Sequence, residues 1–160
     1  MGEKASQERP DGWWRDPPQS EWILDRGHEP TTFELFHDFI IGKAVTTPEA
    51  VAVASMPPSR LIQFDITHPR RGVEYVRLFL SPTDVLEGPA EEEPDLTIRM
   101  NYYDLVAILL GELSVMGAFW GGKATVIGNL TAGIDLFDTI QAIHKKGRTP
   151  RPDFWPSGHP

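Results

Sequence analysis

The apolar positions before residue 60 recur at helical spacing in two segments, and each segment has residues typical of a helix start and a helix end. Thr31-x-x-Glu34 has the form of a capping box, and the apolar residues after it recur at helical spacing as far as Gly42, which suits a helix end. Thr47-Pro48-Glu49 opens a second predicted helix, and Pro57-Pro58 ends it. The chain therefore predicts two helices before its first strand.

Alternating apolar and polar residues then predict strands. The segments Arg60–Thr67 and Val73–Ser81 alternate, and residues 68–72 between them suit a hairpin turn. Further strand patterns cover Asp95–Met100 and residues 123–128.

Two more helices are predicted in the second half. Asn101 is placed as an N-cap, and a last helix runs from about 131 to 145 with a broad apolar arc. Asp135 and Asp138 lie opposite that arc, so we expect them to face water. Strands mixed with non-alternating helices favour an α+β fold, in which helices cover a mostly antiparallel sheet.

The two ends of the chain differ in composition from the part between them. Residues 1–30 and 148–160 are rich in Pro and charge and lack periodicity, which leaves 31–147 as the predicted domain. The end segments carry four tryptophans: Trp13, Trp14, Trp22 and Trp155. We expect their rings to pack on the domain or on a subunit partner. The alternative is that they cover a ligand entrance.

Composition excludes several classes of function. The 160 residues are 40% hydrophobic and 24% charged, as in an ordinary single-domain protein. The net charge of −8 argues against binding nucleic acid. There is no cysteine, and no signal or membrane-spanning pattern is visible, so a cytoplasmic protein is expected. A small basic group at residues 144–148 leaves only a transient contact with acidic lipid open.

No set of residues predicts catalysis or metal binding. Gly117-x-x-x-x-Gly122-Lys123 has the frame of a phosphate-binding loop, but a helix precedes it, a strand follows it, and Ala124 stands where a magnesium-binding Ser or Thr is needed. The five histidines lack metal-ligand spacing, and His37 and His144 are expected to be structural. We therefore predict no metal, no cofactor and no enzymatic activity. Acid–base chemistry from Asp104, Asp135 or His144 is the least favoured alternative.

The segment "PDLTIRMNYYDLVAILLGEL…GAFWGGKATVIGNL" resembles the sterol carrier protein type-2 family of lipid-binding domains. The shared features are, in order, the strand 96–100, Gly111-Glu112-Leu113, the aromatic pair Phe119-Trp120, Gly122-Lys123 and Gly128-Asn129. The resemblance extends over about 32–147. It implies a five-stranded, mostly antiparallel sheet covered by helices, with an apolar tunnel between them.

The same resemblance implies a function, namely non-enzymatic binding and transfer of a sterol, fatty acid, acyl-CoA or phospholipid. The residues expected to line the tunnel are Ile62, Phe64, Leu78, Ile98, Tyr103, Val106, Leu110, Met116, Phe119, Trp120, Leu136 and Ile140. The alternative is an accessory module with a filled core that partners an enzyme acting on hydrophobic substrates. The Trp-rich ends would then make a homodimer or a contact with that enzyme.

Overall fold

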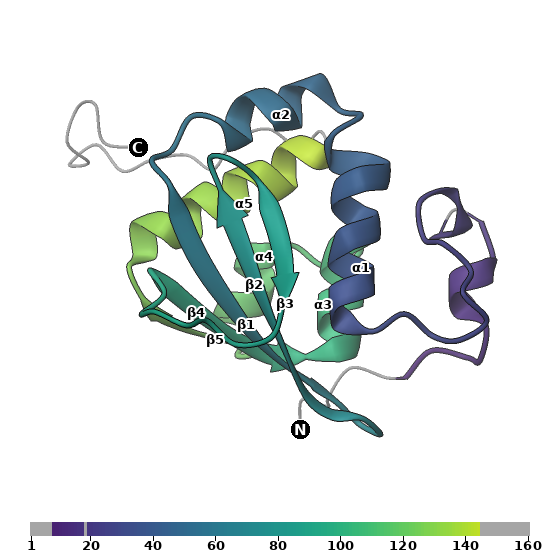
Figure 1. The fold of residues 1–160 in the computed structure, drawn as a ribbon. Helices are drawn as coiled ribbons and strands as arrows, with labels where there is room; N and C mark the ends of the chain where they lie inside the picture. The colour runs from purple at the N-terminus through teal and green to yellow at the C-terminus, as the bar shows by residue number, and fades with distance from the viewer. Residues whose placement is uncertain (1–7, 18, 145–160) are drawn as a thin grey trace.

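A five-stranded sheet forms one layer of the protein (Figure 1), and the computed structural model describes residues 8–17 and 19–144. The strands are β1 (Arg60–His68), β2 (Gly72–Leu80), β3 (Asp84–Glu87), β4 (Leu96–Asn101) and β5 (Ala124–Gly128). They are arranged in the order β3-β2-β1-β4-β5. The β1–β4 pair is parallel and the other three pairs are antiparallel, which confirms the mostly antiparallel sheet.

The predicted hairpin forms the centre of this sheet. Strands β1 and β2 pair from Arg60↔Leu80 to His68↔Gly72, and Gly72 takes a φ of 81°, which glycine adopts without steric cost. Strand β3 was not predicted. It has four residues, of which only Val85 is buried, so it has too little alternation to be recognised in the sequence.

Helices form the second layer and lie together on one side of the sheet (Figure 1). They are α1 (Thr32–Phe39), α2 (Pro48–Ala54), α3 (Tyr102–Leu109), α4 (Val115–Trp120) and α5 (Leu130–Ile143). The capping box before α1 is confirmed: the Glu34 N–H donates to Thr31 Oγ1 over 3.2 Å, and the Thr31 N–H donates to Glu34 Oε1 over 3.0 Å. No described helix has both the length and the apolar character needed to cross a bilayer.

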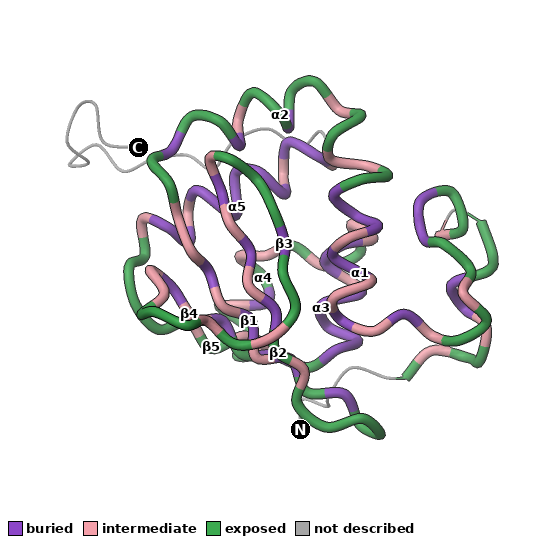
Figure 2. Tube along the Cα trace, in the orientation of Figure 1, coloured by how far each residue is buried: buried purple, intermediate pink, exposed green. Residues whose placement is uncertain are grey.

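Burial follows the two faces of the sheet. On β1, Ile62, Phe64 and Ile66 point toward the helices and are buried, while Gln63 and Asp65 on the other face are only partly covered. The trace in Figure 2 shows buried residues concentrated where the helices meet the sheet. The core is therefore the space between the two layers, and this space also holds the candidate site.

Residues before α1 pack beside that helix (purple in Figure 1). This segment contains two short 3₁₀ turns, η1 (Trp13–Arg15) and η2 (Gln19–Glu21), and buries the rings of Trp13, Trp14 and Trp22. The interpretation that these tryptophans pack on the domain is confirmed. Trp155 lies outside the described residues.

Gly42 does not end the first helix as predicted. After α1 the chain continues through the π-helical segment η3 (Ile40–Ala44), where the Val45 N–H donates to the Ile40 carbonyl over 2.9 Å. A Cβ on Gly42 would meet Trp22 Cβ at 3.0 Å. The glycine is needed because the amino-terminal segment crosses the helix closely at this point.

Candidate functional site

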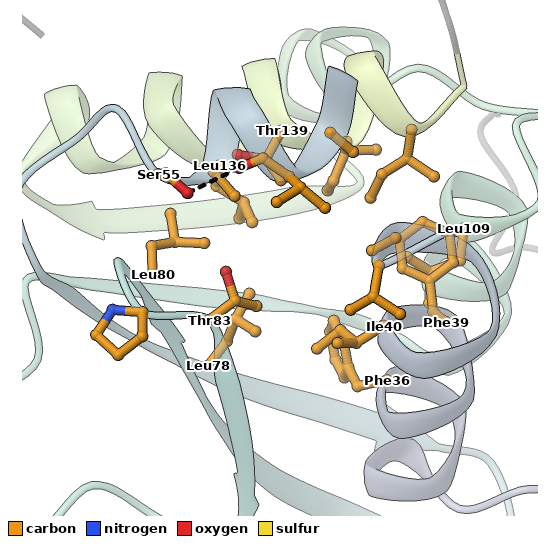
Figure 3. Close-up of a pocket in the computed structure, with 18 residues that line it drawn as sticks. Phe36, Phe39, Ile40, Ser55, Leu78, Leu80, Thr83, Leu109, Leu136 and Thr139 are labelled. Atoms are coloured by element: carbon orange, nitrogen blue, oxygen red, sulfur yellow. Dashed lines mark hydrogen bonds between the residues drawn. The ribbon is translucent and has the colours of Figure 1, made fainter. Parts of the chain in front are cut away.

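An apolar cavity of about 240 Å³ lies between α2, α5, the end of α1 and strand β2 (Figure 3). Leu78 and Leu80 line it from the sheet, and Phe36, Phe39 and Ile40 line it from α1 and η3. We call this space the main cavity. It opens beside α2, whose outward residue Val51 is about half exposed.

Small residues explain why a cavity remains at this place. Pro48 starts α2, and Ala50 and Ala54 follow at i and i+4 on the face that meets α5. Both alanines are buried, so the helix is held against the core, but their methyl groups reach only a short distance into it. Large side chains on α5, Leu136 and Ile140, supply the opposite wall.

A second, narrower cavity of about 30 Å³ adjoins the first, deeper under the sheet. It is lined by residues of β1, β4, β5, α1, α3, α4 and α5, including Phe64, Ile98 and Phe119. Four residues line both spaces: Phe36, Leu109, Leu136 and Ile140. These side chains therefore separate two compartments, where the sequence led us to expect one tunnel.

Three hydroxyl groups are the polar side chains among the eighteen described residues that line the main cavity; they belong to Ser55, Thr83 and Thr139. The Ser55 hydroxyl donates to the Val51 carbonyl over 2.8 Å, and the Thr139 hydroxyl donates to the Asp135 carbonyl over 2.9 Å. Thr139 is buried, whereas Ser55 and Thr83 lie at the exposed rim. No charged side chain is among these lining residues.

Half of the residues expected to line the tunnel border one of the two cavities. In the main cavity these are Leu78, Leu136 and Ile140. In the second cavity these are Phe64, Ile98, Phe119, Leu136 and Ile140. The residues that border neither cavity are Ile62, Tyr103, Val106, Leu110, Met116 and Trp120. Ligand contact remains a prediction for the whole set.

Trp120 departs most from expectation. Its side chain is 76% exposed, and its ring contacts Phe119 edge-on with the centroids 5.1 Å apart. Trp120 is the last residue of α4, a helix of only six residues, so its neighbour Phe119 faces inward while Trp120 faces outward. The prediction that both rings of this aromatic pair point inward is wrong for Trp120.

Sequence reasoning missed the contribution of the first two helices to the site. Phe36 and Ile40 were assigned only to the apolar stripe of a helix, and Phe39 and the alanines of α2 were not assigned at all. The signal available was the pair Ala50 and Ala54, since two small residues at helical spacing leave room beside large partners. The choice of partner depends on tertiary packing.

Two acidic residues of α5 are buried, contrary to the prediction that they face water. Asp135 is 5% and Asp138 1% exposed. The Arg60 guanidinium donates its Nε–H to Asp135 Oδ2 over 3.1 Å, and this ion pair ties the start of β1 to α5. The prediction considered only the residues of the helix. The structure adds Arg60 of β1, whose positive charge offsets the cost of burying the Asp135 carboxylate.

A polar cluster, centred on Glu29, lies at the other end of the molecule. Glu29 accepts hydrogen bonds from Trp13 Nε1 (2.8 Å), the Tyr103 hydroxyl (2.5 Å), His68 Nε2 (2.7 Å) and Arg71 Nη1 (3.1 Å). Burial opposes the charge, but the hydrogen bonds from Tyr103, Trp13 and His68 outweigh it and hold the pKa of Glu29 below its ordinary value. We call these five residues the Glu29 cluster.

The hydrogen bonds of the Glu29 cluster determine the tautomer of His68 and affect the pKa of Tyr103. The Arg70 backbone N–H donates to His68 Nδ1 over 3.1 Å, so the ring proton of this buried histidine is on Nε2. The Nε2–H group donates a hydrogen bond to Glu29 Oε1. Burial, together with the bond to Glu29, raises the pKa of Tyr103 to about 12. Tyr103 thus has a structural partner outside both cavities, which explains why it does not line them.

A second ion pair holds the amino-terminal segment to α1. Asp38 accepts from both terminal nitrogens of Arg26, at 2.9 and 2.7 Å, and from the Leu24 N–H at 3.0 Å. Burial opposes the charge of Asp38, but these bonds hold its pKa below the ordinary value. Trp22 also contacts Phe39 edge-on, with centroids 5.2 Å apart. The amino-terminal segment therefore packs on the outer side of α1, the helix that lines the main cavity.

Comparison with known proteins gives one family and several similar structures. The sequence model described as the SCP-2 sterol transfer family matches residues 48–141, which is more than half of the chain. None of the curated proteins compared with the chain matches it. The matched range includes α2, the sheet and nearly all of α5, and it leaves out α1 and the segment before it.

Three solved structures are similar to this chain, and the two with TM-scores above 0.5 share its fold. The sterol carrier protein domain 2 of Helicoverpa armigera is 21% identical with a TM-score of 0.55, over 78% of this chain and 97% of that one. The sec-alkylsulfatase Pisa1 of Pseudomonas sp. is 15% identical with a TM-score of 0.53, over 82% of this chain but 19% of the sulfatase. Palmitated SCP2L2 of Aedes aegypti is 23% identical with a TM-score of 0.48, over 61% and 91%.

Proposed function

We propose, because the chain belongs to the SCP-2 sterol transfer family, that it binds a hydrophobic ligand in the main cavity and carries it without changing it chemically. The observation that supports this most is the charge-free apolar lining between α2, α5 and β2. A sterol, a fatty acid, an acyl-CoA or a phospholipid each offers an apolar body for such a lining. The sterol carrier domain of Helicoverpa armigera has the same fold.

The size of the cavity sets what enters it. Ligand sites commonly measure about 300–1,000 Å³, so a space of about 240 Å³ holds part of a long chain. Burying each methylene contributes about 0.8 kcal/mol. A longer ligand would gain further burial by displacing the side chains, such as Phe36, that separate the main cavity from the second one.

The lining argues for binding over chemistry. Its polar groups are three hydroxyls, and two of them already donate to helix carbonyls. None of the histidine, aspartate or glutamate side chains within the described ranges lies among the lining residues. A general acid or base must reach the reacting atom directly or through one water. We therefore propose no catalytic step in this cavity.

A second candidate function is an accessory module that partners an enzyme acting on hydrophobic substrates. The observation that favours it is that the same fold makes up about a fifth of the alkylsulfatase Pisa1 chain. A module of this kind would not need an empty cavity, and the division into two compartments is compatible with a core that stays closed.

Native mass spectrometry of protein purified without detergent distinguishes the two functions. We expect an apolar mass that leaves on denaturation, or uptake of a fluorescent fatty acid when the protein is purified empty. Leu136→Trp should abolish that uptake, since Leu136 borders both cavities. Leu113→Trp is the matched control, because this partly buried leucine borders neither cavity and is not among the residues expected to line the tunnel. Circular dichroism checks that both variants are folded.

The outcomes separate cleanly. Loss of uptake in Leu136→Trp alone supports carriage in the main cavity. Equal uptake by both variants would place the ligand elsewhere. An empty wild-type protein that also refuses fatty acids, but forms a stable complex with another chain, would favour the accessory module.

A further inference from the structure

We propose that Trp22, in the segment before α1, is a positioning residue of the main cavity. It holds the Phe39 ring and the π-helical turn η3 in place as one wall of that cavity, and it thereby sets how long a ligand chain the cavity accepts. This inference rests on the proposed function, since it assumes that the main cavity takes a lipid. It assigns a role in ligand selection to a residue that does not touch the ligand.

Trp22 packs on a side chain that belongs to the cavity wall. Its ring is buried and meets the Phe39 ring edge-on, with the centroids 5.2 Å apart. Phe39 is also buried and lines the main cavity from the end of α1 (Figure 3). Trp22 itself borders neither the main cavity nor the second cavity. Its ring therefore supports a lining residue without reaching the ligand space.

The chain at Trp22 also packs on the π-helical turn. A Cβ on Gly42 would meet Trp22 Cβ at 3.0 Å and the Trp22 carbonyl oxygen at 3.2 Å. Ile40 and Ala44 of this turn, and Val45 directly after it, line the main cavity. Single π-helical turns are rare and are frequent at functional sites. We expect this turn to depend on neighbouring packing, which the contact with Trp22 supplies.

Hydrogen bonds on both sides of Trp22 fix its position. The Trp22 N–H donates to the Gln19 carbonyl over 3.2 Å. Further along the segment, the Arg26 guanidinium donates twice to Asp38, at 2.9 and 2.7 Å. Asp38 directly precedes Phe39 in α1, so this ion pair ties the segment to the helix next to the ring that Trp22 supports.

The proposed wall lies outside the part of the chain that matches the family. The match begins at residue 48, after both α1 and η3. Family membership therefore does not describe how this wall is held. The Glu29 cluster anchors the same segment through Trp13, and no residue of the cluster borders the main cavity or the second cavity. This second anchor allows the segment to be weakened without a change beside Phe39.

Removing the Trp22 ring should enlarge the main cavity. Trp22→Ala keeps the Cβ that faces Gly42 but removes the indole, so we expect the Phe39 ring to relax into the vacated space. Each further methylene that becomes buried strengthens binding about fourfold. If the enlarged cavity takes about two more methylenes, a long chain gains on the order of tenfold in affinity relative to a short one.

Two fatty acids of different length measure this effect. Dodecanoate and hexadecanoate are compared on the full chain by equilibrium dialysis at neutral pH, and the readout is the affinity for hexadecanoate divided by that for dodecanoate. Trp22→Ala should raise this ratio about tenfold, and Trp22→Phe, which retains a ring against Phe39, should restore it. Trp22→Leu is a milder variant that should raise the ratio less. Circular dichroism checks that each variant is folded.

The matched control is Glu29→Ala. It removes the acceptor of Trp13 and so weakens the attachment of the same segment, but it leaves the contact between Trp22 and Phe39 in place. We expect the ratio of the two affinities to stay within about twofold of the wild-type ratio, because no contact with the cavity wall is removed.

A double substitution tests whether Trp22 acts through Phe39. Phe39→Leu removes the ring that Trp22 supports. In that background Trp22→Ala should change the ratio by less than about twofold, because the contact between the two residues is already absent. A full tenfold rise in the Phe39→Leu background would contradict the proposed route.

The proposal is supported by a ratio that rises in Trp22→Ala, returns in Trp22→Phe and stays constant in Glu29→Ala. An unchanged ratio in the folded Trp22→Ala or Trp22→Leu protein, or an equal rise in Glu29→Ala, would overturn it while leaving lipid binding intact. If the wild-type protein binds neither fatty acid, the proposed function itself fails, and the role given to Trp22 fails with it.

Discussion

The main cavity and the Glu29 cluster lie in one small domain and are built in opposite ways. The main cavity joins α2 to α5 through small alanines and large aliphatic side chains, and it leaves space unfilled. The Glu29 cluster joins the amino-terminal segment to β1 and α3 through four donors that converge on one carboxylate. In the Glu29 cluster the carboxylate has four hydrogen-bond donors, whereas the main cavity is an unfilled space with apolar walls.

This difference indicates that the Glu29 cluster contributes to stability and that the main cavity provides the space for a ligand. A carboxylate with four partners is specific in geometry and costly to disturb, because each donor loses its acceptor if the carboxylate moves. An apolar space bordered by interchangeable aliphatic groups tolerates ligands of different shape. We therefore expect substitutions in the Glu29 cluster to change stability alone, and substitutions around the cavity to change ligand binding.

The largest change in stability is expected at Phe36, because this ring both fills the core and borders the space proposed for the ligand. Phe36 is 3% exposed, borders both cavities and packs on Phe64 with centroids 4.7 Å apart. Phe36→Ala should lower the free energy of unfolding by about 3–5 kcal/mol, and it should join the two compartments. We expect longer ligands to bind. Urea unfolding and native mass spectrometry with a series of chain lengths measure the two effects.

The control for this substitution is Phe33→Ala on the same helix, because Phe33 is only partly buried and borders neither cavity. It should cost less and leave the range of ligands unchanged. If Phe36→Ala loses stability without accepting longer ligands, the two cavities are not separated by this ring.

The Glu29 cluster predicts the next largest effect. Glu29→Ala leaves Trp13, Tyr103 and His68 without their acceptor and should lower the free energy of unfolding by about 2–4 kcal/mol. Ligand affinity should be unchanged where the variant is folded, because no residue of the cluster borders the main cavity or the second cavity. Glu91→Ala in the exposed acidic loop is the control. A large loss of affinity would show that the two regions are coupled.

The sequence predicted most of the fold because its local signals agree with the tertiary structure. The capping box at Thr31 and the turn ending at Gly72 each act through bonds within a few residues, so a pattern can reveal them. Strand β3 and the π-helical turn after α1 escaped. The first is too short, and the second depends on a contact between Gly42 and Trp22.

The candidate site was less predictable, since it depends on contacts between distant residues. The burial of Asp135 requires Arg60, which is 75 residues away, and the cavity requires α2 to bring its alanines onto α5. Residues on the central sheet, such as Phe64 and Ile98, were found because their alternation places them toward the helices. Apart from the small pair Ala50 and Ala54, the local pattern does not distinguish a residue that borders a cavity from one that fills the core.

The dependence of stability on pH provides a further test of the role of the Glu29 cluster. The pKa of Glu29 is held below its ordinary value of 4.5, so its ionised form stabilises the fold above that pH. That contribution is lost as the pH falls from 4.5 through the folded-state pKa. Glu29→Gln should therefore flatten the loss of stability in this acid range. Urea unfolding at a series of pH values measures the slope, and an unchanged slope would contradict the role given to Glu29.

The smallest effect is expected at Trp120. Because its ring is 76% exposed and borders neither cavity, Trp120→Ala should change the free energy of unfolding by no more than about 0.5 kcal/mol and leave ligand uptake unchanged. Phe119→Ala is the matched comparison, since its neighbouring ring borders the second cavity and its loss should alter uptake of long ligands. If Trp120→Ala weakens uptake instead, the ring must turn inward when a ligand binds, and the position expected from the family resemblance describes the loaded protein.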